Sequence, residues 1–219
     1  MKRRTLPAAT ALAATAALLL TACGGGGGGD NNKGNDKIAG ANAGSGKSAS
    51  PSASASSATD RPKISFPSDA KNVFEDQKTG DATKDAVLAD SAMSVSSMDD
   101  AIFKGSTDTK ALGFYNADKG LNAAITFVQG YINKNYTWIG ETRYFDRKVT
   151  LSGDSQAYVT YCSDESKSFL KNKKTKKVDN TPTSADSYVL YHTSLAKNSR
   201  GVWQTTNIVS NRGDKACQP

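Results

Sequence analysis

Hydrophobic residues between positions 80 and 135 recur every three or four residues, which is the period of an α-helix. One stripe consists of Leu88, Ala92, Val95, Met98 and Ile102. A second stripe consists of Leu121, Ile125, Val128 and Ile132. Gly105 is a suitable end for the first helix, and Asn116 is a suitable N-cap for the second. The pattern predicts two amphipathic helices whose apolar faces contribute to a core.

After Trp138 the hydrophobic period changes to two, in runs rich in β-branched and aromatic residues. The runs are RYFDRKVTL (143–151), QAYVTYC (156–162), SYVLYHTSL (187–195) and GVWQTTNIV (201–209). Because the helices come first and the strands follow, we predict an α+β domain with N-terminal helices packed on a meandering antiparallel sheet. In this arrangement Cys162 lies near the end of a strand.

The N-terminus combines a positive start with an apolar run. Lys2, Arg3 and Arg4 precede the stretch 6–20, which is too short to span about 30 Å of hydrocarbon with ordinary flanks. The run ends in LTAC, which resembles the bacterial lipobox. We therefore predict a lipoprotein signal peptide over residues 1–22 and a lipid on Cys23, so that the mature chain is anchored to the extracytoplasmic face of the cell membrane. The alternative is an ordinary secretory signal with an incidental cysteine.

The segment 23–59 is dominated by Gly, Ala, Ser and Asn, and Ile38 is its only large aliphatic residue. Such a segment cannot bury enough apolar surface to offset the loss of chain entropy, so we predict a disordered linker. The remaining residues, 60–219, are sufficient for one domain with a single core.

The cysteine count agrees with lipidation. Three cysteines in an exported protein leave an odd thiol, but lipidation of Cys23 leaves the even pair Cys162 and Cys217. We predict a disulfide between these two in the oxidising envelope. The alternative is two free thiols.

Three stretches carry a resemblance to a known family. They are RPKISFPSDAKNVFE (61–75), YCSDES (161–166) and GVWQTTNIVSNRGDKAC (201–217). With the order of helices and strands, they resemble actinobacterial lipoproteins of the nuclear transport factor 2-like (cystatin-like cone) superfamily. The resemblance implies a curved sheet that wraps around the helices and can enclose a cone-shaped cavity. In ketosteroid isomerase relatives that cavity holds an Asp general base and a Tyr hydrogen-bond donor.

The residues of the predicted domain offer few catalytic groups. His192 is the only histidine, so we expect no metal site, no cofactor and no catalytic residue. Asp146, Asp164 and Glu165 are the carboxylates on or near strands that an isomerase or dehydratase could use. The candidate pocket residues are Tyr144, Tyr161, Tyr191 and Trp203.

Two hypotheses about function follow. We prefer a non-catalytic module that binds a ligand or a partner. The alternative is a small-molecule isomerase or dehydratase that uses a carboxylate and a tyrosine in the cone. An Asp or Glu that lines an enclosed pocket favours the enzyme, whereas a purely aromatic and aliphatic lining favours binding or a structural role.

The stretch 167–177 contains six lysines in eleven residues. The whole chain has a net charge of +7, and removal of the three positive charges of the signal peptide would leave +4. The residues proposed to contact an anionic envelope polymer or lipid headgroups are Lys171, Lys173, Lys174, Lys176 and Lys177. Nucleic acid is not an expected partner outside the cell. Because like charges repel, we expect these lysines to add nothing to stability, and the alternative is a solvated hairpin that discourages sheet pairing.

Overall fold

A computed structural model describes residues 60–219 of the chain. The predicted signal peptide, Cys23 and the linker lie outside the described residues. The elements are β1 (Ala70–Phe74), α1 (Ala82–Lys104), α2 (Lys110–Tyr115), α3 (Asp118–Asn133), β2 (Tyr136–Ser152), β3 (Gln156–Asn172), β4 (Val178–Asp179), η2 (Ala185–Ser187), β5 (Tyr188–Lys197), β6 (Trp203–Arg212) and η3 (Lys215–Cys217). Within this part of the chain, no helix is long and apolar enough to cross a membrane.

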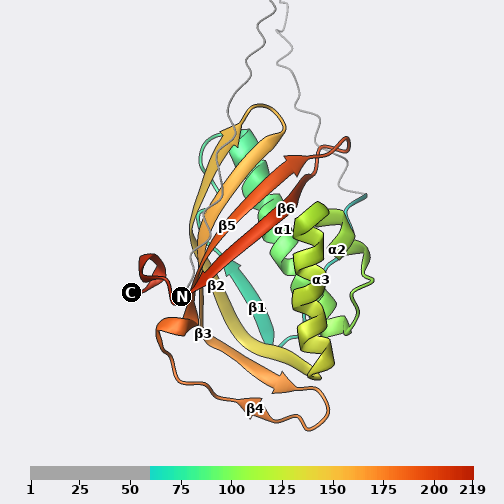
Figure 1. Cartoon of the computed structure of the whole chain (residues 1–219), viewed down its shortest axis with the longest axis vertical. Coiled ribbons are helices and arrows are strands. Elements are labelled where there is room, and N and C mark those ends of the chain that lie inside the picture. Colours follow the sequence, from blue (N-terminus) through green and yellow to red (C-terminus); the bar gives the residue numbers. More distant parts are fainter. Residues whose placement is uncertain (1–59) are drawn as a thin grey trace, which may run out of the picture. The chain divides into compact units, whose positions relative to one another are not determined.

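Three helices pack on one side of a six-stranded sheet, so the domain is α+β (Figure 1). The strand order is β1-β2-β3-β5-β6, with β4 paired to the far end of β3. The expectation of a wholly antiparallel sheet was wrong, because β1 runs parallel to β2. The chain passes through all three helices between these two strands, and a long connection of this kind permits parallel pairing. The sheet is therefore mixed.

The two longest strands, β2 and β3, bend as they follow the helices (Figure 1). The register of β2 shifts between Glu141 and Arg143 and again between Phe145 and Lys148, and such bulges bend a strand. Just before the first bulge, Gly140 has φ +95°, and a Cβ there would lie 2.1 Å from the carbonyl oxygen of Lys167. Only glycine permits this close approach of the two backbones.

Helix α1 begins and ends at clear caps. Asp81 accepts hydrogen bonds from the amides of Thr83 and Lys84, and Gly105 ends the helix in the left-handed conformation, as expected. Four members of the predicted apolar stripe are buried, and Met98 is partly buried. Acidic residues on more than one face of the helix are also buried, since Asp90, Asp99 and Asp100 are nearly inaccessible to solvent. Helix α1 is thus a central helix rather than an amphipathic surface helix.

The second predicted helix corresponds to α3, and a short helix that the sequence analysis did not predict, α2, precedes it. Asn116 is not its N-cap but follows α2, where it is buried and bonded to two serines of α1. The Ser94 hydroxyl donates to Asn116 Oδ1 over 2.7 Å, and Asn116 Nδ2 donates to Ser97 Oγ over 3.1 Å. In α3 the buried face contains Gly120, Ala124 and Val128, whereas Ile125 of the predicted stripe is exposed. Gly120 allows α3 to approach β6, because a Cβ would lie 2.3 Å from the carbonyl oxygen of Thr205.

Strand β3 continues ten residues beyond the run predicted from the sequence. Its second half, SDESKSFLKN, is mostly polar, and pairing with β2 and β4 holds it in the sheet. Cys162 consequently lies in the middle of β3 rather than near its end. The predicted disulfide with Cys217 is present, with the two Cα atoms 5.5 Å apart, and it holds η3 against β3.

Candidate functional site

A cavity of about 80 Å³ lies between the helices and the curved sheet, where the two main hydrophobic clusters of the core meet. Six aromatic side chains contribute to its lining: Phe127, Tyr131, Trp138, Tyr144, Tyr161 and Tyr191. Two acidic residues, Asp99 and Glu165, also line it. Phe127 is 47% exposed, so the cavity reaches the surface beside α3.

The periods of the elements explain why these side chains converge. Tyr144 on β2 and Tyr161 on β3 face the helices, and Tyr191 is the direct partner of Tyr161 on β5. On α1, Val95 and Asp99 are four residues apart and therefore share one helix face. The same spacing places Phe127 and Tyr131 of α3 at the cavity.

The carboxyl group of Asp99 is the most unusual group in this lining. Asp99 is 8% exposed. Its two carboxylate oxygens accept hydrogen bonds from Asn72 Nδ2 (2.7 Å) and from the indole Nε1 of Trp138 (2.9 Å). Burial raises the pKa of this carboxyl to about 7, although the two hydrogen bonds oppose the shift. Near neutral pH the group can therefore be either protonated or ionised.

Asp99 differs from the other buried carboxylates of α1 in its partners. Asp90 pairs with the guanidinium of Arg61 and Asp100 with the ammonium of Lys104. Each of them also accepts a backbone amide hydrogen bond. Among the described residues, no Lys, Arg or His forms an ion pair with Asp99.

At the mouth of the cavity, Glu165 Oε2 accepts a hydrogen bond from Arg212 Nη1 over 2.8 Å. The cavity adjoins a groove of about 320 Å³ that runs between β3 and residues 181–187. The two share four lining residues: Tyr131, Trp138, Glu165 and Ser168. Arg212 lines this groove. The cavity thus adjoins a larger groove beside η2 that has both polar and apolar residues in its lining.

Three of the four predicted pocket residues, Tyr144, Tyr161 and Tyr191, line the cavity. Burial raises the pKa of all three phenols, so they are neutral hydrogen-bonding groups at ordinary pH. Trp203 does not line it: the side chain is buried in the core cluster that contains Leu88. Its role is packing.

The acidic candidates separate in the structure. Glu165 lines the cavity, whereas Asp164 pairs with Arg143 and Asp146 is exposed in a bulge with φ +50°. His192 is exposed, with Nδ1 3.3 Å from Thr160 Oγ1. Within residues 60–219, no group of three His, Cys, Asp or Glu residues is placed to hold a metal ion.

Sequence reasoning missed Asp99, together with Phe127, Tyr131 and Trp138. The available signal was the position of Asp99, four residues after Val95 and three before Ile102 in a predicted apolar stripe. An acidic residue on the edge of such a stripe is ordinarily assigned to the solvent face. The central position of α1 places it in the interior instead.

The lysine-rich stretch is not a uniform loop. Lys171 lies on β3 and pairs with Asp69 over 2.9 Å. Lys173 Nζ donates to the carbonyl oxygens of Ile102 (3.2 Å) and Phe103 (3.1 Å) at the end of α1. The expectation that none of these lysines supports the fold was therefore wrong. Lys174, Lys176 and Lys177 are exposed in the turn that leads to β4.

Comparison with known proteins gave no matching family model and no matching curated protein. Among solved structures, the chain is similar to a ketosteroid isomerase-like protein from Erwinia carotovora atroseptica SCRI1043. That match has 14% identity and a TM-score of 0.39, and it covers 58% of this chain and 93% of that one. The intermembrane space region of the chloroplast protein ARC6 matches with 14% identity and a TM-score of 0.37 over 62% of this chain and 99% of that one. Both likenesses are low, and they carry no argument about ligand or activity.

Proposed function

We propose that the chain is a lipoprotein of the nuclear transport factor 2-like superfamily, anchored on the extracytoplasmic face of a bacterial membrane, whose folded domain binds a small molecule. The observation that carries the proposal is the cavity between the helices and the sheet, whose lining combines six aromatic side chains with the polar groups of Asp99, Thr142, Glu165 and Ser168. Ligand sites commonly combine apolar walls with a few polar groups that orient the ligand. The motif LTAC supports the anchor.

The dimensions of the cavity favour a small ligand. Pockets for drug-sized molecules have volumes of about 300–1,000 Å³, whereas this cavity has about 80 Å³. A buried water needs about 10–15 Å³ of such space, so there is room for roughly five to eight non-hydrogen atoms. A larger ligand would extend into the groove beside η2.

The binding proposal is tested by ligand capture. The full chain is extracted from its native membranes in a non-ionic detergent, and bound small molecules are identified by mass spectrometry. The variant Thr142→Phe fills the cavity, since Thr142 is buried in the lining. Thr150→Phe is the matched control, because Thr150 is exposed on the same strand.

We expect one small molecule to accompany the wild type and Thr150→Phe and to be lost from Thr142→Phe, while all three proteins remain folded by circular dichroism. Equal recovery from Thr142→Phe, or no ligand with any of the three, would contradict the proposal.

A second candidate function, proton transfer as in an isomerase or dehydratase, is favoured by the acidic lining. A carboxyl group with a pKa of about 7 is suited to general acid–base catalysis at neutral pH, and the tyrosine hydroxyls are available as donors. The test is exchange of the α-protons of small ketones into deuterated water. Exchange that is catalysed by the wild type and abolished in Asp99→Asn would support this function.

The anchor has its own test. Cys23→Ala should release the protein from the membrane fraction or leave the precursor unprocessed. The double variant Cys162→Ser, Cys217→Ser is the control that keeps Cys23, and it should remain in the membrane fraction. Normal mature Cys23→Ala protein in membranes would refute lipidation.

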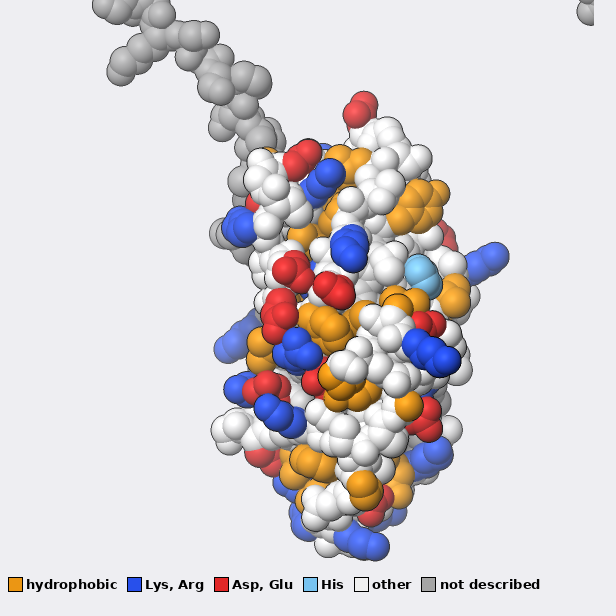
Figure 2. Space-filling view, turned by 90° about the vertical axis from the view of Figure 1, so that its left-hand side faces the viewer, with side chains coloured by type: hydrophobic (Ala, Val, Ile, Leu, Met, Phe, Trp, Pro, Cys, Tyr) orange, Lys and Arg blue, Asp and Glu red, His pale blue; other side chains and the backbone are white. Residues whose placement is uncertain are grey.

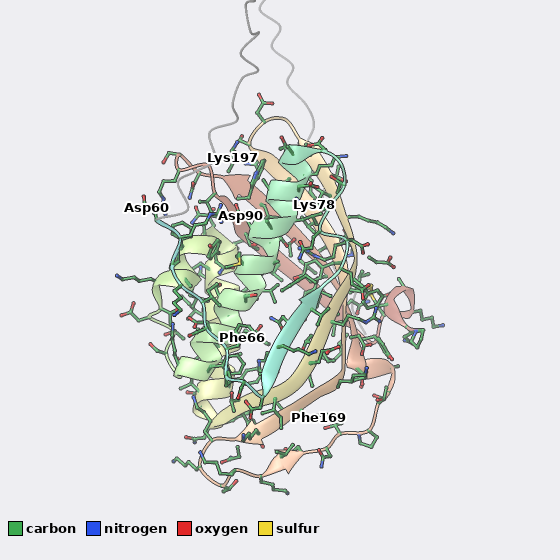
Figure 3. All side chains as sticks on the ribbon, turned by 180° about the vertical axis from the view of Figure 1, so that it is seen from behind. Asp60, Phe66, Lys78, Asp90, Phe169 and Lys197 are labelled. Carbon is green, nitrogen blue, oxygen red and sulfur yellow. A yellow bond between two sulfur atoms is a disulfide. The ribbon has the colours of Figure 1, made fainter. Side chains whose placement is uncertain are left out.

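The exposed lysines of the turn support an anionic partner in the envelope. Asp60, where the described chain begins, and Phe169, on β3 just before the turn, lie at opposite ends of the domain (Figure 3). The exposed lysines beyond Phe169 are available to an anionic envelope polymer or to lipid headgroups. Replacement of Lys174, Lys176 and Lys177 by Gln should abolish a salt-sensitive association with envelope polymer. Association that is unchanged would leave the turn as a solvated hairpin.

A further inference from the structure

The starting point is the charge of Asp99. When this carboxyl ionises, it places a negative charge on a residue that is only 8% exposed, and its two hydrogen-bond donors, Asn72 and Trp138, are both neutral. The second acidic group of the lining, Glu165, is already paired with Arg212. Within the part of the chain that the structure describes, the charge of Asp99 therefore has no counter-ion of its own.

The aromatic walls of the cavity are suited to a cation. Tyr161 and Tyr191 stack with their ring centroids 4.9 Å apart and their planes 13° from parallel. Tyr144 meets Tyr161 at 64° and stacks on Phe74. Each of these stacked tyrosines therefore keeps at most one ring face for a guest. The face of an aromatic ring attracts a cation, and the attraction increases when water is excluded.

A neutral guest would leave the charge of Asp99 uncompensated, whereas an ammonium group can contact both the carboxylate and the rings. We propose that the cavity binds a small organic cation, a primary to quaternary ammonium compound of roughly five to eight non-hydrogen atoms, with Asp99 as its counter-ion. This inference rests on the proposed function and specifies the class of its ligand.

The protonation of Asp99 gives the proposal a pH signature. The ionisable and charged groups around it are Tyr131 on α3, Tyr144 on β2, Tyr161 and Glu165 on β3, Tyr191 on β5 and Arg212 on β6. The tyrosines stay neutral because burial raises their pKa values. Asp99, with a pKa of about 7, changes charge between pH 6 and 8. Affinity for a cation should increase over this interval, and binding should release a proton.

The experiment compares choline, which is of the required size, with 3,3-dimethylbutan-1-ol, which has the same shape without the charge. Binding to the full chain in a non-ionic detergent is measured by calorimetry at pH 6 and pH 8. We expect choline to bind, more tightly at pH 8, and to bind at least about tenfold more tightly than the alcohol at that pH. Asp99→Asn should remove this preference, and Asp164→Asn, which alters a carboxylate outside the lining, should keep it.

The outcomes separate the inference from the proposed function. Equal binding of choline and the alcohol, or a preference that survives in Asp99→Asn, would overturn the cation proposal and leave a ligand-binding cavity. If neither compound binds, the cation proposal is wrong, and ligand capture decides whether the cavity binds another class. Glycerophosphocholine distinguishes the source of the ammonium group: weaker binding than choline supports a free cation, and equal binding would assign a lipid headgroup.

Discussion

Asp90 and Asp99 are two buried carboxylates of one helix that have opposite surroundings. They are nine residues apart in α1, which places them on opposite faces of the helix. Asp90 is 2% exposed and pairs with Arg61, and it also accepts the backbone amide of Trp203. Asp99 has only neutral donors and faces a cavity. The ion pair of Asp90 holds the segment that contains Arg61 against α1. The carboxylate of Asp99 is instead available to a ligand in the cavity.

The largest expected effect concerns the free-energy cost of ionising the buried carboxyl of Asp99. Its folded-state pKa of about 7 lies above the ordinary value of 3.8, so the folded protein favours the protonated form. The contribution of this carboxyl to the free energy of unfolding is therefore fully present below about pH 4. It is lost between about pH 4 and pH 7, and the loss is on the order of 4 kcal/mol. Asp99→Asn removes this fall, because an amide does not ionise.

The measurement is chemical denaturation of the wild type and Asp99→Asn at pH 4, 6 and 8. Titration of the other groups is common to both proteins and cancels in the difference. The free energy of unfolding of Asp99→Asn, relative to that of the wild type, should increase as the pH rises. A difference that stays constant from pH 4 to pH 8 would show that the pKa of Asp99 is not raised.

The second effect concerns the ion pair of Asp90. Arg61→Met leaves a buried carboxylate without its cation and should lower the free energy of unfolding by about 2–4 kcal/mol. The control is Lys71→Met, which breaks a single surface pair with Glu141 and should cost less than about 1 kcal/mol. Equal losses of unfolding free energy in the two variants would mean that burial does not make the Asp90 pair more important for stability than the surface pair.

The smallest effect concerns the C-terminal end of α1, close to Asp99. Lys173→Met removes an ammonium from the last carbonyl groups of the helix and should lower the free energy of unfolding by about 1 kcal/mol. Lys174→Met, in the exposed turn next to it, should change it by less than about 0.5 kcal/mol. Thermal unfolding of both variants at low salt measures the difference, and an unchanged Tm in Lys173→Met would remove the capping role.

Local patterns predicted most of the fold, because helix and strand periods depend on residues that are near in sequence. The stripe from Leu88 to Ile102 predicted α1, and the parity of the cysteines predicted the disulfide. Long-range pairing could not be predicted in this way. The second half of β3 is polar and is a strand because β2 and β4 flank it, and β1 is a short edge strand whose partner lies beyond three helices.

The candidate site was predicted only in part for the same reason. Tyr144, Tyr161 and Tyr191 were identified because they are phenols on predicted strands of a sheet that the family resemblance expects to enclose a cavity. Asp99 was missed because its burial depends on how α1 is surrounded, and its pKa depends on that burial. The role of Lys173 likewise depends on a contact with α1, seventy residues earlier in the chain.

The disulfide also determines where the protein can be labelled. Cys162 follows Tyr161 in β3 and therefore projects from the face of the sheet opposite the cavity. The C-terminal turn η3 lies on that outer side, whereas the helices lie on the other (Figure 1), and basic and acidic side chains are interspersed over this face (Figure 2). A fluorophore or an immobilisation handle joined after Pro219 would leave the cavity mouth unobstructed, so ligand screening can be carried out on surface-coupled protein.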